Sequence, residues 1–139
     1  MFYLCKQVSS SDVFLNLVAR PKEFIRAGKD NSKNYCMDRV EKLKEYLRTN
    51  DKDSFLQHAL ALEYIKVGND EEARNLFNEI LRREPTYIGS YYHLAKLLER
   101  IGDNEKAIKI YERGMEEAKK AGDNHTYNEL QAAYEDLVY

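Results

Sequence analysis

The stretches GNDEEA at residues 68–73 and GDNEKA at residues 102–107 decide the fold of this chain. The second begins thirty-four residues after the first. In each, a glycine is followed by short polar and acidic residues, as expected where one helix ends in a left-handed glycine and a capped helix follows. The pair therefore predicts an internal repeat made of helix, tight turn and helix.

Shifting the sequence by the same offset aligns the apolar residues on both sides of these turns. The aligned pairs are Leu60 and Leu94, Ala61 and Ala95, Ala73 and Ala107, Leu76 and Ile110, Phe77 and Tyr111, and Leu81 and Met115. Their spacing places them on one face of each helix. Ser54 and Gln57 have the spacing of a capping box, and Pro85 predicts the end of the helix before it. We predict helices at 38–49, 54–67, 70–83, 88–101, 104–120 and 124–138.

These positions resemble the tetratricopeptide repeat (TPR) family, and the chain resembles a small bacterial-type member. The matching residues are Leu60, Ala61, Tyr64, Gly68, Ala73, Phe77 and Pro85 in the first unit, and Tyr91, Leu94, Ala95, Gly102, Ala107 and Tyr111 in the second. Gly114 and Lys119 depart from the family's usual Ala and Pro, which leaves the last helix of the second unit free to run longer. The resemblance implies an all-α fold of antiparallel helix-turn-helix repeats, stacked as a short right-handed α-solenoid.

We expect the chain to have two parts. Residues 1–36 are rich in turn-forming residues and are predicted to be a poorly structured arm, with room for one short helix at 12–20. The remainder is predicted to be a TPR-like domain. Its parts are a degenerate leading repeat helix at 37–53, repeats at 54–87 and 88–121, and a capping helix at 122–139.

Composition and charge argue against several classes of partner and site. The net charge of −2 offers no global field for nucleic acid or an anionic membrane, so neither is expected as a partner. The apolar runs are too short to span a bilayer. Cys5 and Cys36 lack the spacing of a redox or zinc site and are expected to be free thiols in the cytoplasm.

No catalytic motif is present, so we expect no enzyme activity and no cofactor. His58 and His93 fall on successive first helices, nearly one repeat apart, and could lie near one another. Two imidazoles without an obvious third ligand make a poor zinc site, so no metal is expected either. Tyr92 is the tyrosine that we expect to be exposed and functional.

In TPR proteins the first helix of each hairpin lines a concave groove that receives a peptide. The resemblance implies a groove lined by His58, Leu62, Lys66, Tyr92, Lys96, Arg100, Thr126 and Leu130. Some family members clamp a peptide's terminal carboxylate with Lys and Asn, but His58 and Leu62 stand at those positions here. An aromatic and apolar floor flanked by cations favours an acidic, partly hydrophobic peptide. Alternatively, Lys96 and Arg100 pair with local acids such as Glu99.

Two functions remain open at this point. The first is a protein–protein interaction module that binds a partner segment in the groove. The second is a structural or self-associating assembly protein, whose groove is filled by its own arm or by a second copy. The sequence leaves the oligomeric state and the partner's identity open.

Overall fold

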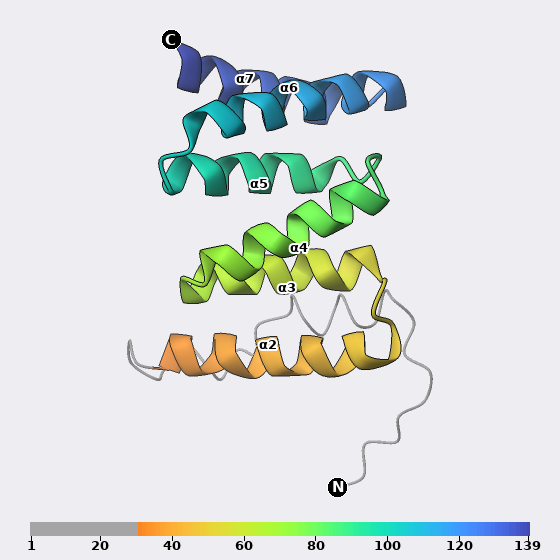
Figure 1. Cartoon of the computed structure of the whole chain (residues 1–139), viewed down its shortest axis with the longest axis vertical. Coiled ribbons are helices and arrows are strands. Elements are labelled where there is room, and N and C mark those ends of the chain that lie inside the picture. The colour runs from red at the N-terminus through yellow and green to blue at the C-terminus, as the bar shows by residue number, and fades with distance from the viewer. Residues whose placement is uncertain (1–30) are drawn as a thin grey trace, which may run out of the picture. The chain divides into compact units, whose positions relative to one another are not determined.

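The computed structural model describes residues 31–139 of the chain, with side chains from residue 34 onward, and residues 36–139 form one compact unit. The described part is helical throughout and contains no strand. Its helices are α2 (Asn31–Thr49), α3 (Ser54–Val67), α4 (Asp70–Arg83), α5 (Gly89–Arg100), α6 (Asn104–Ala121) and α7 (Asn124–Val138). Helices α3 to α7 follow one another as a single stack (Figure 1).

The helices pack mainly against their neighbours in sequence. Helix α3 packs on α4, α5 on α6 and α6 on α7, and α4 joins the first hairpin to α5. Each hairpin therefore buries the apolar face that its neighbour leaves open. This arrangement confirms the predicted all-α helical repeat fold.

The repeated turns end their helices as predicted. Gly68 and Gly102 adopt left-handed φ angles of 82° and 84°, which cost a glycine little because it has no Cβ. The predicted capping box at the start of α3 is wrong. Asp53 is the cap, because its side chain accepts a hydrogen bond of 3.0 Å from the Leu56 amide. The Ser54 side chain is used elsewhere.

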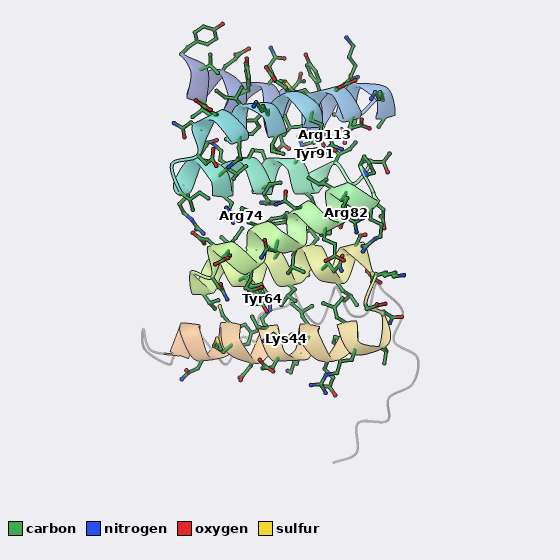
Figure 2. The ribbon with its side chains drawn as sticks, viewed as in Figure 1. Lys44, Tyr64, Arg74, Arg82, Tyr91 and Arg113 are labelled. Atoms are coloured by element: carbon green, nitrogen blue, oxygen red, sulfur yellow. The ribbon has the colours of Figure 1, made fainter. Side chains whose placement is uncertain are left out.

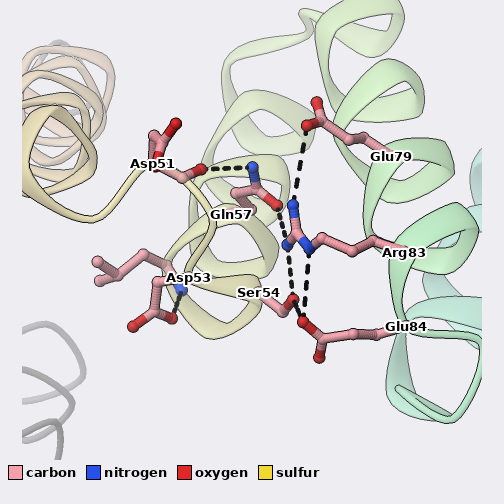
Figure 3. Close-up of polar contacts among 8 residues, drawn as sticks. Asp51, Asp53, Ser54, Gln57, Glu79, Arg83 and Glu84 are labelled. Carbon is pink, nitrogen blue, oxygen red and sulfur yellow. Dashed lines mark hydrogen bonds and ion pairs between the residues drawn. The ribbon is translucent and has the colours of Figure 1, made fainter.

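Ser54 belongs to a network that ties the start of α3 to the end of α4 (Figure 3). The Arg83 guanidinium donates to the Ser54 hydroxyl at 2.7 Å and to the Gln57 side-chain carbonyl at 2.8 Å. The Ser54 hydroxyl in turn donates to Glu84 at 2.6 Å. Because Ser54 and Gln57 are buried, these bonds replace the water that both side chains lose on folding.

Helix α2 is the main departure from the predicted helix bounds. It begins at Asn31 and not at residue 38, so residues 31–36, which we expected to belong to a poorly structured arm, are helical. The other bounds agree with the structure to within one residue. The short helix expected at 12–20 lies outside the described residues.

The core is built from small residues at helix crossings and large rings between them. Ala73 and Ala107 are fully buried, as the repeat register requires. Phe77, Tyr91 and Tyr111 are the largest fully buried side chains. Their rings fill the space that the small residues leave between neighbouring helices.

Tyr91 shows how tightly these elements meet. The Arg113 guanidinium of α6 lies 5.9 Å from the centroid of its ring, and the two residues lie side by side in Figure 2. The backbone of α6 passes so close that a Cβ atom added at Gly114 would lie only 2.7 Å from the Tyr91 Cβ. Gly114 thus permits a closer approach of α5 and α6 than the family's usual Ala would.

Candidate partner-binding surface

The predicted groove residues on the first two repeats occupy one face each of α3 and α5. These residues are His58, Leu62 and Lys66 on α3 and Tyr92, Lys96 and Arg100 on α5, and we call them the α3–α5 surface. Spacings of four residues keep each set on one side of its helix. The helices meet where the His58 Nδ1 lies 2.8 Å from the Ser90 hydroxyl.

Aromatic rings gather at this meeting point. The centroid of the His58 ring lies 5.4 Å from those of Phe77 and Tyr87 and 5.3 Å from that of His93. Tyr92 contacts His93 edge to face at 5.6 Å. We call these five residues the aromatic cluster. All of them except Phe77 are partly exposed, so the cluster presents fixed rings to the surface.

The structure confirms that His58 and His93 lie near one another. Burial, with a smaller contribution from the neighbouring His93, lowers the pKa of His58 to about 4. Burial also lowers the pKa of His93. Both imidazoles are therefore neutral at neutral pH and act as half-buried aromatic rings. Within residues 34–139, no three His, Cys, Asp or Glu side chains are placed to hold a metal ion.

Sequence reasoning missed two residues of this region, Tyr87 and Ser90. Tyr87 lies in the turn after Pro85 and Ser90 in the first turn of α5, and neither belongs to the apolar repeat pattern. Ser90 is fully buried, and its hydroxyl holds the His58 ring in place. The first repeat has Leu56 at the position that corresponds to Ser90. This change from an apolar to a polar residue is the only sequence signal for the contact.

The cations of the α3–α5 surface have acidic partners. Lys66 pairs with Glu63 at 2.8 Å and Lys96 with Glu99 at 3.2 Å, each within its own helix. The structure thus shows the local pairing that the sequence left open.

Arg100 pairs across the repeat boundary with Asp70 of α4. The two carboxylates that neutralise the lysines also have further donors. Glu63 pairs with Arg39 at 3.1 Å, and Glu99 accepts a hydrogen bond from the Tyr111 hydroxyl. The charge that this surface offers to an anionic partner is therefore smaller than its lysine and arginine count suggests.

The two predicted groove residues on α7 lie elsewhere. Leu130 is fully buried and belongs to the core, so it cannot contact a partner at the surface. Thr126 forms part of a helix cap, because its amide and hydroxyl donate to Asp123 at 3.0 and 2.7 Å. The prediction for these two residues assumed a constant offset of thirty-four residues.

The offset changes because α6 is longer than α4. Helix α6 continues to Ala121, and Asp123 then caps α7 as Asp53 caps α3. Leu130 consequently corresponds to Leu94, thirty-six residues earlier, and both are buried. Applied to the surface residues of α5, this offset selects three exposed residues of α7, Asn128, Ala132 and Asp136. The matching apolar pattern of α5 and α7 was the signal that could have revealed it.

The fold and this surface define an α-helical repeat protein with partly exposed aromatic side chains on its first helices. The sequence profile described as tetratricopeptide repeat matches residues 64–134, just over half of the chain. None of the curated proteins matches the chain. Solved structures with similar folds do match it.

Two of these structures are of a tetratricopeptide repeat domain protein from Salinibacter ruber. Its solution structure is 39% identical, covers 63% of this chain and 88% of that one, and gives a TM-score of 0.61. Its crystal structure is 40% identical, covers 62% and 96%, and gives 0.59. A protein from Bordetella parapertussis is 26% identical, covers 70% and 85%, and gives 0.63.

The chain belongs to the tetratricopeptide repeat family. Members of this family are generally protein–protein interaction modules without enzyme activity. Between residues 31 and 139, no helix combines the length and the apolar character needed to cross a membrane.

Proposed function

We propose that this chain is a non-enzymatic protein–protein interaction module, and that it binds a segment of a partner protein across the α3–α5 surface. The observation that carries the proposal is the aromatic cluster, in which four of the five rings are partly exposed. Large aromatic side chains that are fixed by their neighbours typically carry much of the energy of a protein interface.

The cluster is suited to apolar contact because its rings are already held in place. His58 is fixed by the Ser90 hydroxyl at 2.8 Å, and Tyr92 rests against His93 at 5.6 Å. Binding therefore costs these side chains little conformational entropy. Since both imidazoles are neutral, an apolar or aromatic side chain of the partner is the natural complement.

The expectation that the partner is acidic rests only on Lys96 and Arg100, which already have acidic partners. A carboxylate from the partner would compete with Glu99 for Lys96 and with Asp70 for Arg100. Exchanging one exposed ion pair for another contributes little to affinity, about 0–1 kcal/mol. We therefore propose that apolar contact supplies most of the affinity and that acidic residues of the partner fix its register. We also propose a cytoplasmic location, which the free thiol of Cys36 supports.

Affinity capture with an immobilised chain tests this function. Tyr92→Ala should reduce the yield of the specifically captured partner on the order of tenfold, as truncation of an interface anchor does. Tyr46→Ala is the matched control, because Tyr46 is an exposed tyrosine on α2, a helix that carries none of the residues of this surface. The double variant Lys96→Glu with Arg100→Glu tests the charged end of the surface without removing buried atoms.

Thermal melts establish that each variant is folded, and mass spectrometry identifies and quantifies the captured proteins. Equal recovery of the same partners by the wild type and by both α3–α5 variants would show that this surface is not the binding site. Light scattering addresses the self-association alternative. A wild-type dimer that Tyr92→Ala dissociates would favour a second copy as the occupant.

A further inference from the structure

A second surface feature lies between α4 and α6. It is an open depression of about 460 Å³. Arg74, Asn75 and Asn78 of α4 and Lys106, Lys109 and Ile110 of α6 form its walls. Its floor is the side of α5 that carries Leu94 and Leu98. Tyr92 and Lys96 point to another side of α5, because successive helical residues turn by about 100°. The depression is therefore separate from the α3–α5 surface.

The charge around this depression is one-sided. None of the residues that line it is acidic, while three of them are cations. Lys106 has a partner, since its Nζ lies 2.5 Å from Asp103 Oδ2. Arg74, labelled on α4 in Figure 2, and Lys109 form no ion pair with any residue from 34 to 139. This contrasts with Lys66, Lys96 and Arg100, each of which has an acidic partner.

Asp103, the acidic partner of Lys106, is not among the lining residues. Lys106 lowers the pKa of its carboxyl most, and Arg74 adds a smaller effect in the same direction. The lining thus holds three cations and no carboxylate, and within residues 34–139 only Lys106 among them has an acidic partner, so the depression keeps a positive excess. Anionic groups of a partner can complete the pairing there without displacing an existing ion pair from Arg74 or Lys109.

The depression also offers apolar and amide groups. Leu94 and Leu98 are nearly fully buried beneath it, while Ile110 on its wall is partly exposed. Asn75 and Asn78 are exposed, and their amides can donate hydrogen bonds to carboxylates. Its volume lies in the range of about 300–1,000 Å³ that is usual for ligand sites. Cations around an apolar wall match a segment in which acidic and aliphatic residues are mixed.

We propose that this α4–α6 depression binds an acidic segment of a partner protein. Carboxylates of the segment contact Arg74 and Lys109, and an aliphatic side chain contacts Ile110. The chain would then have two partner surfaces of different chemistry, an aromatic one on the first helices and a basic one on the second helices. The second surface does not depend on whether the first one binds.

Fluorescence anisotropy with a defined probe tests the proposal on the full chain. The probe is a short labelled peptide in which Glu alternates with Leu, and the matched peptide carries Gln in place of Glu. The wild type should bind the Glu peptide and not the Gln peptide, with an affinity that falls as salt rises. The double variant Arg74→Glu with Lys109→Glu should bind the Glu peptide on the order of tenfold more weakly or less.

The control is Lys42→Glu with Arg48→Glu, which makes the same change of net charge on exposed residues of α2, outside both surfaces. The milder Arg74→Gln with Lys109→Gln serves if the reversal impairs folding, as judged by circular dichroism melts. The proposal is overturned if the wild type does not bind the Glu peptide, if the control weakens binding as much, or if only the control does. A wild-type dimer that Arg74→Glu with Lys109→Glu dissociates would also overturn it, in favour of a second copy of this chain.

Discussion

Gly114→Ala is a sharp test of the packing between α5, α6 and α7. The new Cβ would lie 2.7 Å from the Tyr91 Cβ, 3.0 Å from its Cγ and 3.1 Å from Leu130 Cδ1. Tyr91 has little room to yield, because its side chain is fully buried and its hydroxyl donates to the Pro85 carbonyl at 3.0 Å. One methyl group must therefore push two helices apart.

Two opposing free energies set the size of the effect. Overpacking a close-packed core costs about 1–3 kcal/mol. Replacing glycine by alanine inside a helix returns about 1 kcal/mol. We expect a net loss of up to about 2 kcal/mol in the free energy of unfolding. A domain of this size loses about 4–8 °C of Tm for each kcal/mol.

Urea and thermal unfolding, followed by circular dichroism, measure this change. Gly89→Ala is the matched control, because a Cβ at Gly89 would meet nothing within 4 Å. It should leave the Tm unchanged or raise it slightly. The packing described for Gly114 would be refuted by a Gly114→Ala protein that melts at or above the wild-type temperature.

Four further substitutions test other parts of the structure. Ala73→Leu and Ala107→Leu should each lower stability by about 1–3 kcal/mol in thermal melts, because both residues are fully buried at helix crossings. Arg83→Met should cost about 1–3 kcal/mol in urea unfolding, because it leaves the buried Gln57 side chain without its donor. The pKa of His58 is about 4 when folded, against an ordinary 6.5, so the unfolded chain binds more protons between these values and stability falls as the pH drops through this window. His58→Gln should remove part of that fall, on the order of 2 kcal/mol, in urea titrations at pH 7 and pH 4.5, and an unchanged pH dependence would contradict it.

The turns were predictable because their causes are local. Gly68 and Gly102 end their helices through a backbone conformation that favours glycine in any context. The register of α7 was not predictable from a constant offset. A constant offset from the end of α4 would end α6 at residue 117, but the missing proline and the new cap at Asp123 let it continue to Ala121. The offset thereby grows from thirty-four to thirty-six residues, and two extra residues turn every following side chain by about 200°. Leu130 consequently lies inside and not at the surface.

The polar contacts of the candidate site were harder to foresee. The sequence allowed Lys96 and Arg100 either to await a partner or to pair locally, and only the fold brings Asp70 of α4 to Arg100 of α5. The Ser90 contact that fixes His58 likewise joins residues thirty-two positions apart. Hydrophobic periodicity predicts which side of a helix is buried, but it does not predict which charged side chains pair across a repeat boundary.

The neighbour-to-neighbour packing of the helices determines how a bound ligand would change the unfolding of the protein. Because each helix packs mainly against its neighbours in sequence, the helices at the ends of the stack can unfold before those in the middle. A ligand that bridges α3 and α5 would couple the two hairpins across their junction. Binding should therefore steepen the unfolding transition as well as move its midpoint, and hydrogen exchange in α4 and α5 would slow together.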